Sequence, residues 1–303
     1  MPWCRYVLVA ALTMLTVAYA AAHDAPHPRT APARRIDPSV LYPAGVVSGG
    51  GGHFHALLAL GSGIPLLAGT HLGLFRSDDR GRTWRLAAAR FSGEDVHAVA
   101  GSRSALYAAT HGQGLLVSAD GGVRWRDDSS GLPGRDLHAI AVDPRAPDGV
   151  YAWVVGHGLF YRKARRQRWE SRAGARTLAD VNSLAVHPED PARLYAGTTK
   201  GVWVGDDRGG HWRLPRGGLA LHTAGVAVPP ARADLLLAAT LDGAFIGAPD
   251  GTRWRPMSPG PDWWGPLVGF AFVATTPTRV MAVFHEGIVA ARPLDSGAWM
   301  PLD

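Results

Sequence analysis

Histidine is the residue whose number and spacing indicate chemistry in this 303-residue sequence, which contains 13 of them. Seven recur in two settings, either at the start of an apolar segment or at the tip of a Gly-containing hairpin further along the chain. They are His55, His71, His97, His111, His138, His157 and His285, and His53 adds an eighth. Imidazoles that share a pocket with carboxylates bind transition metals such as zinc or copper.

The elements that must position these histidines belong to a repeat of roughly 42 residues. Six tryptophans mark it at intervals of 41 to 45 residues: Trp84, Trp125, Trp169, Trp212, Trp254 and Trp299. Each repeat contains four short apolar segments separated by turns, most clearly at residues 183–186, 194–197, 201–204 and 212–214. Four strands per repeat are typical of a propeller blade. The sequence therefore predicts an all-β, six-bladed β-propeller of four-stranded antiparallel blades, with seven blades as the alternative.

Alignment of the repeats places polar residues at one end of the first strand of each blade, the strand that lines the channel. His55, His97, His138 and Asn182 become equivalent, and His53, Asp95, Asp136 and Asp180 lie two residues earlier on the same side of the strand. We expect a transition-metal site of His53, His55, His97 and His138. We expect His71, His111, His157 and His285 to bind a ligand at the same channel mouth. The alternatives are a solvated polar rim, a site for an anionic ligand, or acid and base groups.

One hairpin carries a family resemblance. Ser77-Asp78-Asp79-Arg80-Gly81-Arg82-Thr83-Trp84 matches Ser-x-Asp-x-Gly-x-Thr-Trp at every defined position. The chain from His55 to Asp303 thereby resembles the bacterial exported, glycosyl hydrolase-like Asp-box (BNR) propellers, whose repeat is shared with sialidases and sortilin-type receptors. The resemblance implies a propeller but not catalysis, since enzymes and binding proteins both contain this repeat. Because the polar residues of the motif are lost in later repeats while Trp persists, we expect the boxes to be structural.

A glycoside hydrolase is the alternative to a binding or scaffold protein. Such an enzyme needs two facing carboxylates, for which Asp95, Asp136 and Glu286 are the candidates. Sialidases are recognised by an arginine triad and a Tyr–Glu pair. This sequence has no Arg-Ile-Pro start in its first blade and only four glutamates. The resemblance therefore assigns no catalytic residue, and we expect a protein without catalysis of its own.

Two further segments are candidates for contacts with partners. Trp263 and Trp264 lie in the loop of residues 261–266, where they could stack on a glycan or an envelope protein, or pack against a neighbouring blade. Residues 162–168 replace the third Asp-box with five positive charges. This run is interpreted either as a docking patch for an anionic surface or as a solvated basic loop.

The N-terminus predicts export. Residues 1–22 have the basic, apolar and small-residue regions of a signal peptide, and residues 23–52 form a Pro/Gly-rich linker, expected to be largely disordered, before the propeller of residues 53–303. Residues 39–42 are the part of the linker apolar enough to add an edge strand. The only cysteine, Cys4, lies in the signal. We expect a periplasmic or extracellular protein without a disulfide or a transmembrane segment.

The formal net charge is +6, from 31 basic and 25 acidic residues. An exported protein has little occasion to meet nucleic acid, so this balance points to anionic surfaces instead. The expected partner is a small ligand, a glycan or an envelope protein at the channel mouth.

Overall fold

The computed structural model describes residues 39–43, 54–60, 65–102, 104–165, 167–257, 267–273, 279–284, 288–294 and 297–301. The expected signal peptide and most of the linker lie outside these residues, as do five residues singled out from the sequence: His53, Trp263, Trp264, His285 and Glu286. Within the described part, the helical segments are three short 3-10 turns, η1 (Ala89–Phe91), η2 (Ala173–Thr177) and η3 (Asp207–Gly209). No helix there has the length and apolar character needed to cross a membrane.

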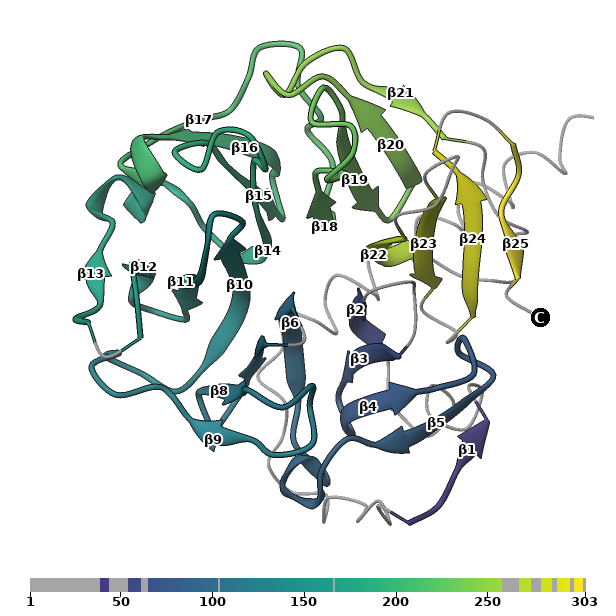
Figure 1. The fold of residues 1–303 in the computed structure, drawn as a ribbon. Helices are drawn as coiled ribbons and strands as arrows, with labels where there is room; N and C mark the ends of the chain where they lie inside the picture. The colour runs from purple at the N-terminus through teal and green to yellow at the C-terminus, as the bar shows by residue number, and fades with distance from the viewer. Residues whose placement is uncertain are drawn as a thin grey trace, which may run out of the picture. The chain divides into compact units, whose positions relative to one another are not determined.

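The described residues form six sheets, one for each repeat, and each sheet is built on four consecutive antiparallel strands (Figure 1). Blade 1 contains β2 (Phe54–Ala59), β3 (Leu66–Thr70), β4 (Gly73–Ser77) and β5 (Thr83–Leu86), and blade 2 contains β6 (Val96–Ser102), β7 (Ala105–Thr110), β8 (Leu115–Ser118) and β9 (Arg126–Asp127). Blade 3 contains β10 (Leu137–Asp143), β11 (Ala146–Val154), β12 (Gly158–Arg162) and β13 (Glu170–Ser171), and blade 4 contains β14 (Val181–Val186), β15 (Leu194–Thr198), β16 (Gly201–Asp206) and β17 (His211–Arg213). Blade 5 contains β18 (Thr223–Ala227), β19 (Leu236–Thr240), β20 (Gly243–Gly247) and β21 (Arg255–Pro256), and blade 6 contains β22 (Leu267–Val273), β23 (Arg279–Phe284), β24 (Val289–Pro293) and β25 (Met300–Pro301).

The ring closes after six blades. Each innermost strand contacts the innermost strand of the next blade, and β22 of blade 6 returns to contact β2 of blade 1. All four strands of blade 6 come from the end of the described chain, so closure needs no strand from the N-terminus. The predicted six-bladed propeller is confirmed.

An extra edge strand extends blade 1. β1 (Tyr42–Pro43) pairs with β5, with Tyr42 opposite Trp84. The Tyr42 ring also packs edge-on against Phe75 at a centroid distance of 6.5 Å. The expectation that residues 39–42 contribute an edge strand is therefore met at Tyr42.

The core lies between blades rather than in one central mass. The second strand of most blades is buried along its whole length, as in β3, β7, β15 and β19. Apolar residues on both faces of these strands pack against the sheets on either side, which is why they form continuous apolar runs. One cluster joins Trp84 and Phe54 of blade 1 to Val289 of blade 6 and so seals the ring where its ends meet.

The segment from Ser77 to Trp84 forms the hairpin between β4 and β5 at the outer rim. Asp79 accepts hydrogen bonds from the Thr83 hydroxyl (2.6 Å) and the Thr83 amide (2.9 Å), and the Gly81 amide donates to Ser77 Oγ (2.7 Å). Gly81 has a φ of 96°, which a residue with a side chain rarely adopts. Trp84 is 0% exposed, and its indole N–H donates to the Gly81 carbonyl at 3.0 Å. Each of these residues therefore has a structural task.

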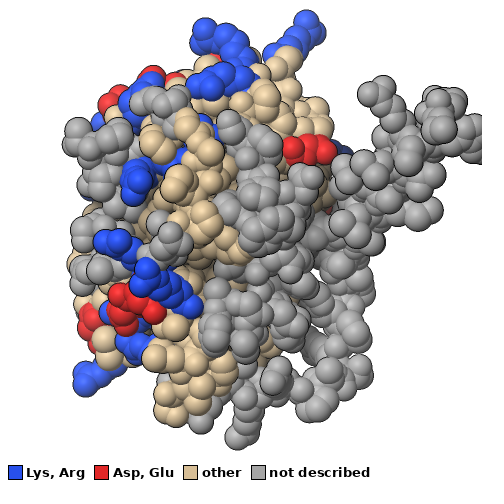
Figure 2. All heavy atoms as spheres, turned by 90° about the vertical axis from the view of Figure 1, so that its right-hand side faces the viewer, with Lys and Arg blue, Asp and Glu red and all other residues tan. Residues whose placement is uncertain are grey.

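Charge is dispersed on the part of the surface that Figure 2 shows. Basic and acidic side chains are interspersed there over the described blades. Some ion pairs of the described residues are local in sequence, such as Arg232 with Asp234 at 2.8 Å.

Candidate metal centre

A β-bulge occurs at the same place in the innermost strand of all six blades. The strand register shifts between the first and third residues, as between Phe54 and Ala56 or between Val96 and Ala98. A bulge re-aims the side chain of the residue it contains. The bulged residues are His55, His97, His138, Asn182, Ala224 and Val268, in blade order.

The three bulged histidines form a stacked row across blades 1 to 3. The rings of His55 and His97 have centroids 4.7 Å apart, and those of His97 and His138 are 4.4 Å apart, with interplanar angles of 14° in both pairs. Histidines about 40 residues apart in the chain thus become neighbours, as the blade alignment predicted.

Two further histidines reach this row from the hairpins between second and third strands. A buried threonine shapes each hairpin: Thr70 Oγ1 accepts the Gly73 amide at 3.1 Å, and Thr110 Oγ1 accepts the Gln113 amide at 2.9 Å. The residue that follows each threonine is a histidine. His71 lies edge-on to the His55 ring (centroids 4.1 Å apart), and the His111 ring is 5.8 Å from those of both His97 and His138.

Asp95 lies among three imidazoles. Its Oδ2 is 2.8 Å from His71 Nδ1, and its Oδ1 is 3.3 Å from His55 Nε2. His97 Nε2 is 3.4 Å from Asp95 Oδ2, which is an ion-pair distance rather than a hydrogen bond. Asp95 Oδ1 and His97 Nε2 are both buried without a hydrogen-bond partner.

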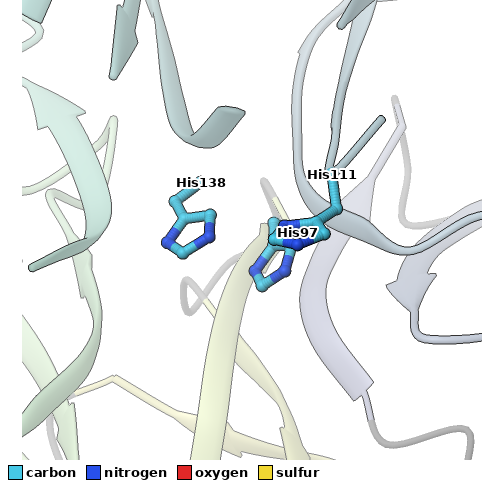
Figure 3. Close-up of side chains that lie close together, drawn as sticks. All are labelled: His97, His111 and His138. Carbon is cyan, nitrogen blue, oxygen red and sulfur yellow. The ribbon is translucent and has the colours of Figure 1, made fainter. Parts of the chain in front are cut away.

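Asp136 occupies the equivalent position in blade 3 and lies beside two imidazoles, those of His111 and His138. Its Oδ1 lies 2.8 Å from His111 Nδ1 and 3.7 Å from His138 Nε2. Asp136 Oδ1 is buried and, apart from these ion-pair contacts, makes no hydrogen bond. Figure 3 shows the imidazoles of His97, His111 and His138 gathered in one place.

Two sets of three ligand atoms are compact enough to hold one metal ion each. In His97, His111 and His138, and in His55, Asp95 and His97, the ligand atoms lie within 4.8 Å of one another. Ligands of a tetrahedral zinc ion lie roughly 3.3–3.4 Å apart, since each is about 2.0–2.1 Å from the metal. The distance of 3.3 Å between Asp95 Oδ1 and His55 Nε2 matches this value, while His97 Nε2 lies 3.4 Å from the other carboxylate oxygen, Oδ2. His97 belongs to both sets.

The electrostatics keep His55 and His138 neutral and favour the protonated form of His111. Burial lowers the pKa of His138 to about 4, helped by its neighbour His97, and burial lowers the pKa of His55 well below its ordinary value. The Asp136 carboxylate raises the pKa of His111. Burial alone would raise the pKa of Asp95, but the surrounding imidazoles outweigh it and lower the pKa. Neutral imidazoles beside an ionised carboxylate are the protonation states that bind metal.

Three other described residues were predicted to lie at the channel mouth, and none of them belongs to a compact set of ligands. Asn182 continues the row into blade 4, where its side-chain amide donates to the Thr223 carbonyl at 3.1 Å. In the same blade, Asp180 accepts a hydrogen bond from the Thr199 hydroxyl at 3.5 Å. His157 is exposed at the turn between β11 and β12 and belongs to neither compact set of ligands among the described residues.

One residue at the channel mouth was missed from the sequence. His222 precedes β18, two residues before the bulged Ala224, and so occupies the position of Asp95 and Asp136 in blade 5. Its Nε2 lies 3.5 Å from the Asn182 side-chain amide. Extending the blade alignment to the fifth repeat would have revealed it, since the spacing to the apolar strand is the same.

The carboxylates proposed for hydrolysis contact imidazoles. Asp95 contacts His55, His71 and His97, as described above, and Asp136 contacts His111 and His138. The neighbouring Glu94 accepts hydrogen bonds from the Gln113 amide and side chain.

Comparisons with known proteins support the fold. No family model matches the chain, and no curated protein matches it. Among solved structures, an ancestral GH74 enzyme is similar with a TM-score of 0.53 at 15% identity, over 82% of this chain and 38% of that one. The extracellular domain of the hybrid two component system BT3049 from B. thetaiotaomicron is similar with a TM-score of 0.55 at 12% identity, over 80% of this chain and 34% of that one. The chain thus spans little more than a third of these proteins, and the likeness shows a β-propeller fold only.

Proposed function

We propose that this protein is an exported Asp-box propeller that binds a transition-metal ion, zinc or copper, at the channel mouth through His97, His111 and His138. The convergence of these three imidazoles from three separate chain segments carries the proposal. Imidazole ligands favour zinc or copper over calcium or magnesium. Three protein ligands leave a coordination position open, where a small ligand, a glycan or a group from an envelope protein would bind.

The carboxylates have a supporting task in this proposal. A histidine that binds metal through one ring nitrogen commonly contacts a carboxylate through the other, which sets its tautomer and orientation. Asp136 beside His111 Nδ1 supports that arrangement, because it leaves His111 Nε2 for the metal. Asp95 orients the row from the other side through His97.

Binding without catalysis agrees better with these contacts than glycoside hydrolysis does. A glycosidase needs one carboxyl group to donate a proton and another to face the sugar. Both Asp95 and Asp136 are instead in contact with imidazoles, and the first has a lowered pKa, which is unsuited to a general acid. The GH74 enzyme shares the propeller fold, and a hydrolase of the same architecture is the competing proposal.

Metal analysis of the purified full-length protein tests the proposal. We expect zinc or copper at a fixed ratio to protein, and loss of the metal in His97→Ala, because His97 belongs to both ligand sets. His157→Ala is the matched control, since it removes an exposed histidine outside both sets. Asp136→Asn should weaken binding about 10- to 100-fold, the usual effect of losing an orienting carboxylate.

Removal of the metal gives a second readout. A ligand present at about 100 times its Kd stabilises the folded state by about 2.7 kcal/mol. Thermal unfolding with and without a chelator should therefore differ for the wild type and for His157→Ala, but not for His97→Ala. If His97→Ala and His157→Ala contained equal amounts of metal and a chelator changed the unfolding of neither, the cluster would not bind metal and the proposal would be wrong.

A further inference from the structure

The rim of blade 3 differs at its tryptophan from the rims of blades 1, 2, 4 and 5. In four blades the indole N–H donates to the carbonyl of a glycine three residues earlier, at 2.8 to 3.1 Å; these are Trp84, Trp125, Trp212 and Trp254. Residue 166, three before Trp169, is an arginine. Trp169 Nε1 is buried and has no hydrogen-bond partner. A donor that is satisfied in the repeat is therefore left free in blade 3.

This indole lines a groove at the outer edge between blades 2 and 3. One wall comes from β9 and the residues after it, and the other from the hairpin between β12 and β13 (Figure 1). The basic residues lining it are Arg126, Arg162, Arg165 and Arg168. The basic run interpreted from the sequence thus supplies a groove rather than only a solvated loop.

Two arginines that line the groove, Arg162 and Arg165, each carry an Nε–H donor without a partner. The Arg162 side chain is 4% exposed and lies over the Trp169 ring at 4.6 Å, and its Nε has no hydrogen-bond partner. Arg165 Nε is also buried and without a partner. Three residues that line this groove therefore each carry a buried N–H donor without a partner. Native proteins rarely leave buried donors unpaired, and each such group calls for an acceptor.

The acidic residues of the groove are already paired. Asp128 accepts from Arg162 Nη2, and Asp127 accepts from Arg135 Nη2 at 2.6 Å. Arg165 Nη2 pairs with Asp148 at 3.0 Å, which leaves its Nε for another acceptor. Arg126 and Arg168 are exposed along the same groove. The buried, unpaired side-chain atoms of the groove are thus donors, and the groove is lined by four arginines and two aspartates.

We propose that this groove binds an oxyanion: a carboxylate, sulfate or phosphate group held by Arg162 Nε, Arg165 Nε and Trp169 Nε1. An oxyanion has several lone pairs in a compact group, and charge-assisted hydrogen bonds from guanidinium groups to it are stronger than neutral ones. The site is independent of the metal centre, because it lies at the outer edge and shares no residue with it.

The indole N–H resonances of the full-length protein test the proposal directly. The Trp169 signal is identified by its loss in Trp169→Phe, which keeps an aromatic ring but removes the donor. Titration with sulfate, phosphate and acetate should move this signal along a saturating curve for at least one anion. The Trp125 signal is the internal control and should stay in place, because its N–H is already bonded to Gly122. The anion that binds most tightly identifies the ligand class.

Arg165→Gln provides a second variant, since Arg165 is partly exposed and its loss should be tolerated better than that of buried Arg162. It should weaken anion binding about tenfold, the effect expected from one charge-assisted hydrogen bond. A Trp169 signal that moves only linearly, and equally in chloride of matched ionic strength, would overturn the proposal. Unchanged anion affinity in Arg165→Gln would also overturn it.

Discussion

The outer rim and the channel mouth are built from the same repeat but vary in opposite ways. At the rim, the Trp–Gly bond is the same in four blades while the polar residues around it change. At the channel mouth, the backbone bulge is the same in all six blades, but the bulged residue changes from His to Asn, Ala and Val. Side-chain identity is therefore retained where it holds blades together and varies where the fold does not depend on it.

The bulges of blades 5 and 6 show why the histidines are not structural. Ala224 and Val268 occupy the bulge there without a polar side chain, and the innermost strands still pair normally beyond it. The bulge therefore needs no imidazole. Histidines at this place in blades 1 to 3 are better explained by binding than by folding, which is the difference that the following predictions test.

The largest effect is expected at the rim. Trp84→Ala should lower the free energy of unfolding by about 3–5 kcal/mol, because a fully buried indole and its hydrogen bond are lost. Urea unfolding measures the loss, and Val123→Ala on the same rim should change stability little, since Val123 is exposed. Metal content per folded molecule should be unchanged in Trp84→Ala. A Trp84→Ala protein as stable as the wild type would contradict the structural role of the rim.

Substitution of Gly69, which packs against the bulge of blade 2, should change both the stability of the fold and metal binding at the channel mouth. A Cβ added to Gly69 would lie 2.4 Å from the Val96 carbonyl oxygen, at the start of the bulge that contains His97. Gly69→Ala should therefore cost about 1–3 kcal/mol by overpacking and should also weaken metal binding by displacing His97. Gly269→Ala is the matched control, since the nearest atom to its Cβ would be 3.5 Å away. Normal metal affinity in Gly69→Ala would show that the site tolerates movement of this strand.

The smallest effect is a pH dependence confined to the rim. Burial alone would raise the pKa of Asp79, but hydrogen bonds from Thr83 and Ser77 outweigh it and lower the pKa. A carboxyl with a depressed folded pKa stabilises above its unfolded pKa of about 3.9 and loses this stabilisation as pH falls through the folded value. The stability difference between wild type and Asp79→Ala, about 1 kcal/mol at pH 7, should therefore shrink below about pH 4. Urea unfolding at pH 7 and pH 3 measures it, and a difference that grows on acidification would contradict the assigned contacts.

Residue patterns alone predicted the fold because each blade is encoded locally. The spacing of the tryptophans, the turn residues and the apolar segments recur within about 42 residues, and each sets one four-stranded sheet. The alignment of these repeats also predicted that His55, His97 and His138 would be neighbours. It missed His222 because the fifth repeat has no histidine at the bulge itself to mark the position.

The sequence by itself determined the six repeats, the strands within them and the face on which histidines gather, since these depend on local periodicity and on the alternation of strand direction. That six blades close the ring was decided by the contact between β22 and β2. Only the tertiary structure decided which side chains meet. It brought hairpin His111 into contact distance of Asp136 and grouped it with His97 and His138, it left His157 apart, and it left the Trp169 indole without an acceptor. These outcomes depend on the bulges, which re-aim side chains, and on the packing of one blade against the next. The spacing of residues along the sequence specifies neither.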